Sequence, residues 1–163
     1  NGVLLQMFNH RLTASALFCF VGFIEQRSGG WRGLEDFGGL RKAAPVFCGL
    51  MGIALFASLG LPGLNGFVGE FLIFKGAFSL AGWAASLSTL GLLVTAVFLL
   101  TFLQRVWSGP LTPKWNRFAD LTTTERLIVL PGIALMFVLG VWPQLAIGVI
   151  NTTVLRLVAQ LQP

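Results

Sequence analysis

An interrupted apolar run at residues 61–71, LPGLNGFVGEF, constrains this chain more than any other stretch. Proline cannot donate a backbone hydrogen bond and glycine weakens a helix interior, so the run predicts two helical segments separated by a break. Four residues are expected to form that break: Pro62, Gly63, Asn65 and Gly66. In a membrane, a broken backbone is tolerated only where protein or a water-filled cavity satisfies its polar groups. The adjacent Glu70 is therefore a candidate functional carboxylate. The alternative is a loop between two short helices, with Glu70 an ordinary interfacial charge.

The composition places this broken run in a membrane protein. Of 163 residues, 55% are hydrophobic and 10% are charged, whereas soluble domains have about 25% charged residues. The formal net charge is +5, but the basic residues lie between apolar segments rather than in one patch, so nucleic-acid binding is not expected. We therefore predict an all-α integral membrane protein.

The residue pattern does not predict a cofactor or metal site. The two cysteines, Cys19 and Cys48, lie in separate apolar segments, without a CxxC pair and with a single histidine in the chain. Zinc, haem and iron–sulfur sites need more ligands, so buried structural thiols are expected instead. The sequence also lacks a phosphate-binding or dinucleotide motif. No metal or cofactor is therefore expected to bind this chain.

Apolar segments near the spanning length of about 20 residues predict about four transmembrane helices, the second of them discontinuous. The predicted spans are residues 3–25, 45–61 continued by 67–78 after a break at 62–66, 83–107 and 125–142. The apolar tail at 144–163 fits an amphipathic interfacial helix or a further span equally well. Since the chain opens inside a membrane-helix pattern, we expect it to be the C-terminal piece of a longer protein.

Charge placement favours one discontinuous second span over two separate spans. With four spans, the basic loops at 26–44 and 108–124 lie on the same side, and the uncharged connection at 79–84 lies on the other. Two full spans between residues 45 and 80 would put the basic loops on opposite sides. The positive-inside rule then predicts that both basic loops are cytoplasmic.

Few ionisable residues fall within the spans. Glu70 has no ion-pair partner on its own helix face, because Lys75 is five residues away rather than three or four. Glu70 must therefore face the bundle interior, meet another helix or be protonated. His10 can relay a proton near neutral pH or pack against a neighbouring helix, and both alternatives stay open. Lys75 and Arg11 are expected to extend toward the membrane interface.

Several stretches resemble one known family. GGL at 38–40, Pro45 and LFASLGLPGLNGFVGEF at 55–71 are similar to the antiporter-like subunit M of bacterial respiratory complex I, the counterpart of mitochondrial subunit 4. Three further stretches resemble helices of the same family: MFNHRLTASALFCFVGFIEQR at 7–27, LQRVWSGP at 103–110 and LGVWPQ at 139–144. The resemblance covers essentially the whole chain and corresponds to about the last third of the family's length.

The resemblance implies a role in proton translocation. Members of this family are proton channels built from two inverted repeats, each with a broken helix, and quinone reduction in other subunits drives them. By resemblance, Glu70 is the terminal carboxylate of the second half-channel, and His10 belongs to its polar axis. NADH, FMN, iron–sulfur clusters and quinone would then be bound by partner subunits. The expected partners include neighbouring antiporter-like subunits of complex I in the bilayer of a bacterial inner membrane.

The motif also defines alternatives and one departure. Glutamate at position 70 favours the M type, since related antiporter-like proteins tend to have lysine there. A subunit of a multi-subunit Na+/H+ antiporter or of a membrane-bound hydrogenase is the alternative function, and a structural membrane anchor is the third. The family usually has glycine after the histidine. Here Arg11 puts a bulky cation beside the proposed relay.

Overall fold

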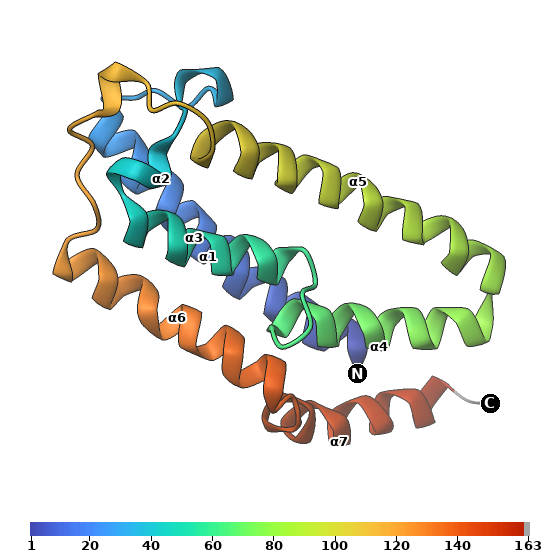
Figure 1. The fold of residues 1–163 in the computed structure, drawn as a ribbon. Helices are drawn as coiled ribbons and strands as arrows, with labels where there is room; N and C mark the ends of the chain where they lie inside the picture. Colours follow the sequence, from blue (N-terminus) through green and yellow to red (C-terminus); the bar gives the residue numbers. More distant parts are fainter. Residues whose placement is uncertain (162–163) are drawn as a thin grey trace.

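A computed structural model describes residues 1–161, and within that range the ordered elements are helices without strands (Figure 1). The elements in chain order are α1 (Gly2–Ser28), η1 (Leu34–Asp36), α2 (Leu40–Ala43), α3 (Pro45–Ser58), α4 (Asn65–Leu80), α5 (Gly82–Trp107), η2 (Pro113–Trp115), α6 (Thr123–Val141) and α7 (Gln144–Leu161). The all-α membrane fold is thus confirmed. Residues 162–163 of the predicted tail lie outside the described residues.

The helices have the lengths that a bundle crossing a membrane requires. Helices α1, α5 and α6 are each long and apolar enough to span, and α3 is a shorter apolar helix. Helices α3 and α4 follow one another along the side of α1, so the two half-helices together make one passage (Figure 1). The prediction of a discontinuous second span is therefore confirmed.

The break lies earlier in the chain than expected. Helix α3 ends at Ser58 and α4 begins at Asn65, which leaves residues 59–64 outside both helices. Pro62 and Gly63 lie in this segment, but the prediction that Asn65 and Gly66 belong to the break was wrong, because both are in the first turn of α4. The turn is made instead at Gly60 and Gly63, whose φ angles of 71° and 95° favour glycine.

The polar backbone of the break is satisfied by protein. Gly60 N donates to Ala57 O at 3.3 Å, Leu61 N to Phe56 O at 3.0 Å, and Leu64 N to Leu61 O at 3.0 Å. Helix α6 closes over the same segment, since a Cβ at Gly140 would come within 2.3 Å of Gly63 O. These contacts meet the condition under which a broken helix is tolerated in a membrane.

The two basic loops meet at one end of the bundle (Figure 1). Gly39 N donates to Ser108 O at 3.1 Å, and Thr112 N donates to Gly38 O at 3.3 Å. At the opposite end, α4 and α5 are joined by Ala81 alone, so the predicted connection at 79–84 is almost entirely helical. Helix α7 turns away from α6 close to the helix break, where Gly140 lies against Gly63 (Figure 1).

The densest packing is near the loop end, where α1, α3 and the 108–122 segment converge. Phe47 is fully buried there, with its ring edge-on to Phe20 at 5.3 Å and to Phe118 at 6.2 Å between centroids. In contrast, α5 presents an exposed apolar face, as expected of a helix in contact with lipid or further protein. The loop end is therefore a rigid base from which the broken helix extends.

Candidate functional site

Glu70 lies in the second turn of α4 and its carboxylate points back to the break. The side chain is partly buried. A Cβ added at Gly60 would come within 2.4 Å of Glu70 Oε2, so the carboxylate occupies the space that a side chain at position 60 would fill. Gly60 therefore positions Glu70. Sequence reasoning missed this glycine, although its place just after the last turn of α3 was a usable signal.

Glu70 has no ion pair or hydrogen bond from its side chain to another group in residues 1–161. The five-residue spacing between Glu70 and Lys75 predicted that these two side chains would not form an ion pair, and the structure has none between them. Glu70 lines a cavity of about 570 Å³ that lies between the break, α4 and α5. Most of the cavity wall is aromatic or aliphatic, and Thr89 contributes a hydroxyl from α5. A carboxylate in such surroundings is a group able to accept and release a proton.

A pair of buried asparagines fixes the start of α4 against α1. Asn9 Nδ2 donates to Asn65 O at 2.7 Å, and Asn65 Nδ2 donates to Asn9 O at 3.3 Å. Both residues are at most 1% exposed. Thr13 on the next turn of α1 has its Oγ1 3.1 Å from Asn9 O. The pair explains why Asn65 is helical: its side chain and carbonyl bind α1 rather than shaping the break.

The place where α4 packs against α1 and α3, called the crossing below, depends on close backbone contact. A Cβ at Gly66 would come within 1.9 Å of Ala57 O, and one at Gly69 would come within 2.1 Å of Gln6 Oε1. Both glycines therefore allow α4 to approach α3 and α1. Three amide oxygens near this crossing are buried and have no hydrogen-bond partner within the described chain: Gln6 Oε1, Asn9 Oδ1 and Asn65 Oδ1. The crossing is thus polar as well as tightly packed.

His10 is placed on an exposed side of α1, next to the exposed Arg11. Its neighbour Asn9 faces α4, but the imidazole itself forms no hydrogen bond within residues 1–161. The structure does not bring His10 and Glu70 into contact. A direct proton transfer between these two candidate residues is therefore not part of this geometry.

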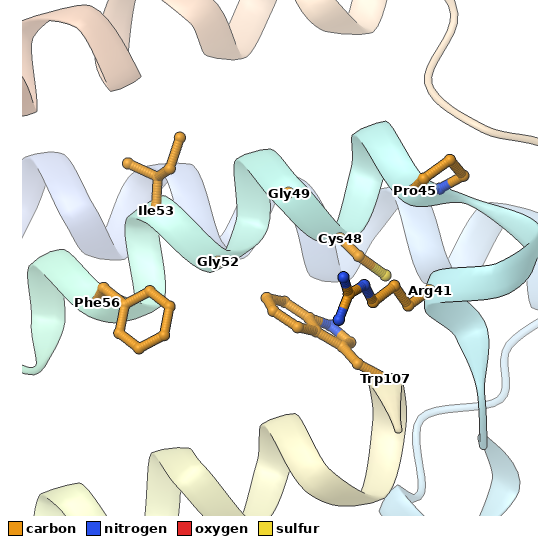
Figure 2. A pocket seen from close by; sticks show the side chains of 8 residues that line it. All are labelled: Arg41, Pro45, Cys48, Gly49, Gly52, Ile53, Phe56 and Trp107. Carbon is orange, nitrogen blue, oxygen red and sulfur yellow. The ribbon is translucent and has the colours of Figure 1, made fainter. Parts of the chain in front are cut away.

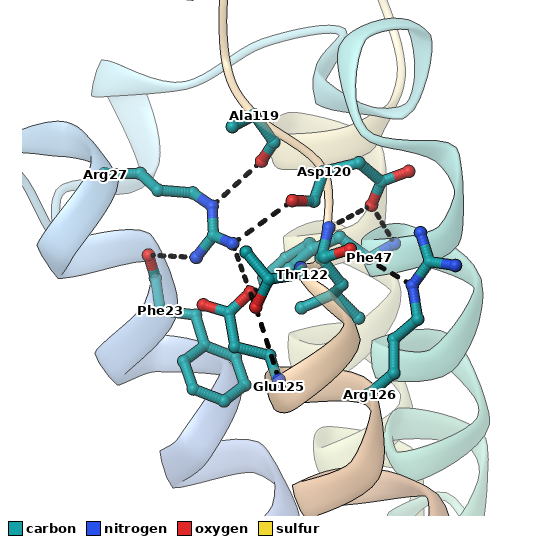
Figure 3. Close-up of polar contacts among 9 residues, drawn as sticks. Phe23, Arg27, Phe47, Ala119, Asp120, Thr122, Glu125 and Arg126 are labelled. Atoms are coloured by element: carbon teal, nitrogen blue, oxygen red, sulfur yellow. Dashed lines mark hydrogen bonds and ion pairs between the residues drawn. The ribbon is translucent and has the colours of Figure 1, made fainter.

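A second polar cluster lies at the loop end and holds three helices together (Figure 3). Arg27, in the last turn of α1, donates to Phe23 O at 3.1 Å, to Ala119 O at 2.9 Å and to Asp120 O at 3.2 Å. The same guanidinium forms an ion pair with Glu125, and both side chains are less than 15% exposed. Charge-assisted contacts of this kind are stronger than neutral hydrogen bonds.

The carboxylate of Asp120 extends this cluster to α3. Its oxygens accept from Val46 N at 3.0 Å and from Phe47 N at 2.8 Å, both in the first turn of that helix. A negative charge there complements the helix dipole and satisfies free N–H groups. At the start of α6, Thr122 and Glu125 form a capping box. The Arg27 and Asp120 contacts were missed because they join segments about 75 to 93 residues apart.

A separate cavity of about 420 Å³ runs along α3 (Figure 2). Cys48 and Trp107 face it, and Arg41 lies at its end. A Cβ at Gly52 would come within 2.6 Å of Trp107 Cη2, so the glycine allows the indole to rest on the helix. Cys48 is 1% exposed and Cys19 is partly buried, and both thiols are free. Within the described residues, no group of three or more His, Cys, Asp or Glu side chains is gathered for a metal ion.

Comparisons with known proteins identify a family and several relatives that this chain resembles in sequence. The family described as "NADH:quinone oxidoreductase/Mrp antiporter, TM" matches residues 1–102. NADH-quinone oxidoreductase subunit M of Mycobacterium tuberculosis H37Rv is 39% identical over 94% of this chain and 28% of its own length. NADH-ubiquinone oxidoreductase chain 4 of Marchantia polymorpha is 36% identical over 96% of this chain and 32% of its own length.

A solved structure gives the same result for the fold. A chain of respiratory complex I from Thermus thermophilus with bound NADH superposes with a TM-score of 0.71 at 28% identity, covering 87% of this chain and 32% of that one. The chain thus spans 28 to 32% of the length of these relatives. Because the family match covers residues 1–102 of 163, this chain belongs to the transmembrane family of NADH:quinone oxidoreductase and Mrp antiporter proteins.

Proposed function

We propose that this chain is the C-terminal part of a proton-translocating membrane subunit of an NADH–quinone oxidoreductase, in which Glu70 accepts and releases a proton. One observation carries the proposal. The Glu70 carboxylate lies at the helix break, facing a cavity, without a cation paired to it in residues 1–161. Intramembrane ionisable groups without a structural partner are expensive, so their presence favours a transport role over a packing role.

The environment of Glu70 suits a group that changes its charge. Its cavity has mostly apolar walls, and the polar crossing beside it offers unpartnered amide oxygens on Gln6, Asn9 and Asn65. Buried polar atoms of this kind usually bind ordered water, and water carries protons between groups that do not touch. A proton on Glu70 can therefore arrive or leave through water rather than through a neighbouring side chain.

His10 is proposed as a further group of the proton path. Its exposed position on α1 leaves the imidazole free to meet water or another helix. The proposal follows the family resemblance of MFNHRLTASALFCFVGFIEQR at 7–27.

Partners, cofactors and location are proposed from the family resemblance and from the arrangement of the basic loops. NADH oxidation and quinone reduction are proposed to take place in partner subunits that bind FMN and iron–sulfur clusters. This chain would adjoin other membrane subunits of complex I, including antiporter-like neighbours. We further propose a bacterial inner membrane with the loops 26–44 and 108–124 in the cytoplasm. The meeting of both loops at one end supports that orientation, since they contain six basic residues: Arg27, Arg32, Arg41, Lys42, Lys114 and Arg117.

Replacing Glu70 with Gln in the full-length protein tests the proton role. The substitution keeps the shape of the side chain and removes its ability to ionise, so proton translocation measured in sealed vesicles should fall by about tenfold or more. Glu25→Gln is a matched control, because Glu25 pairs with Arg32 in an exposed ion pair at the end of α1. Unaltered proton movement in the Glu70→Gln protein would leave the structural anchor as the better account.

The family description also names an antiporter, so a Na+/H+ antiporter subunit is the second candidate function. Copurification separates the two. Flavin and iron–sulfur subunits that copurify with the full-length protein, together with NADH-driven proton movement, support the oxidoreductase. Na+-dependent proton exchange without those subunits would support the antiporter. The printed names of the relatives reported above favour the oxidoreductase.

A further inference from the structure

Lys75 lines the same cavity as Glu70. The cavity extends from Leu59 and Gly60 in the break along α4 to Phe78, with Thr89 and Leu92 on the α5 side. Glu70 and Lys75 are the charged side chains among the residues that line it. Five residues of helix separate them by roughly 7.5 Å along the axis of α4. The sequence predicted only that Lys75 extends toward the membrane interface.

Along α4, Glu70 is nearer to the helix break and Lys75 is nearer to the end of the helix. Lys75 lies nearer than Glu70 to Ala81, at the end opposite the basic loops. Two aromatic pairs on α4, Phe67 with Phe71 and Phe74 with Phe78, border this part of the helix and keep its surroundings apolar. Electrostatic interactions are stronger in such surroundings than in bulk water.

The four helices that pack on α4, namely α1, α3, α5 and α6, bring no other charged side chain to Glu70 within the described residues. Helix α3 has none, and α5 has none before Arg105 at its far end. Helix α6 packs on α4 near Gly140, and its charged residues, Glu125 and Arg126, lie at the loop end. Helix α1 presents neutral amides to α4, while His10 and Arg11 are exposed.

We propose that Lys75 is a positioning residue for proton release, whose ammonium group stabilises ionised Glu70 across their shared cavity and so eases the loss of its proton. This inference rests on the proposed function, because it assigns a regulator to the same carboxylate. Coulomb's law gives the size of the effect. Opposite unit charges about 10 Å apart, at an effective dielectric constant of about 20, shift a protonation equilibrium by about one pH unit.

Infrared titration of the full-length protein in its membrane complex tests this inference. The carbonyl stretch of protonated Glu70 is identified as the band that is absent from the Glu70→Gln protein. Its midpoint is then measured in Lys75→Met, Lys75→Gln and Lys75→Arg. We expect both neutral variants to move the midpoint about one pH unit to higher pH, and Lys75→Arg, which retains the charge, to leave it in place.

The outcomes distinguish this inference from the proposed function. An unmoved midpoint in the neutral variants overturns the role of Lys75. An equal shift in Lys75→Arg overturns it as well, because packing rather than charge would then be the cause. If one neutral variant does not assemble, the other decides the comparison. The proposed function fails separately, through unaltered proton movement in the Glu70→Gln protein.

Discussion

The closest backbone approach in the bundle makes Gly66→Ala the most demanding substitution. A Cβ at this position would lie 1.9 Å from the carbonyl oxygen of Ala57. Carbon and oxygen approach no closer than about 3.3 Å even in favourable C–H···O contacts, so α3 and α4 must separate by about 1.4 Å. A backbone carbonyl cannot rotate away as a side chain can. The separation also pulls on the Asn65–Asn9 hydrogen bonds one residue earlier.

The expected magnitude follows from three contributions. Overpacking costs about 1–3 kcal/mol, and weakening the buried asparagine pair costs about 1–3 kcal/mol. The higher helix propensity of alanine returns up to about 1 kcal/mol. The net loss in the free energy of unfolding is therefore about 1–6 kcal/mol.

The matched control lies on the same helix. Gly76 has no heavy atom within 4 Å of an added Cβ, so Gly76→Ala should be neutral or slightly stabilising. Unfolding of the full-length protein in mixed micelles, titrated with a denaturing detergent, compares both variants with the unsubstituted chain. A Gly66→Ala protein within about 0.5 kcal/mol of the Gly76→Ala protein would refute the close approach of α3 and α4.

Two further predictions concern the polar contacts. Asp120→Asn removes the charge that serves Val46 N and Phe47 N, so the free energy of unfolding should fall by about 1–2 kcal/mol in the same titration, and an unchanged stability would contradict the capping role. Asn9→Leu should cost about 1 kcal/mol, because it removes the buried hydrogen bond from Asn9 Nδ2 to Asn65 O, while Asn65 Nδ2 keeps the backbone oxygen of residue 9. The Asn9→Leu, Asn65→Leu double variant should lose about the sum of the single losses, because each side chain donates to the backbone of the other residue, and a strongly non-additive mutant cycle would contradict two separate hydrogen bonds.

The sequence predicted what local chemistry controls. Proline and glycine in LPGLNGFVGEF located the break to within a few residues, and the spacing of Glu70 and Lys75 excluded an ion pair along the helix. The exact ends of the break depended on tertiary contacts. Gly66 is a site of close approach to Ala57, and Asn65 is a partner for Asn9. Sequence alone does not distinguish a glycine needed for a turn from a glycine needed for packing.

The residues of the candidate site likewise fall into those that the sequence could identify and those that required the structure. Glu70 was identified because a carboxylate in an apolar segment is costly. Gly60 was missed, since its role depends on which side chain folds back over it. The sharing of one cavity by Glu70 and Lys75 also needed the path of α5, which no local pattern encodes. The contacts of Arg27 with Asp120 and Glu125 join segments that are far apart in the sequence, so the sequence could not predict them either.

The single residue between α4 and α5 has a mechanical consequence. Asp120 anchors the start of α3 to the loop end, and Ala81 couples α4 to α5 with almost no slack. Within residues 1–161, the six-residue segment 59–64 is the non-helical link between α3, which is anchored at the loop end, and the α4–α5 hairpin, whose start is held to α1 by the Asn9–Asn65 pair. A rotation of the hairpin about Gly60 and Gly63 would displace Lys75 more than Glu70, because Lys75 is farther from these glycines along α4. A small change of angle at the break would thus alter the surroundings of the lysine more than those of the carboxylate.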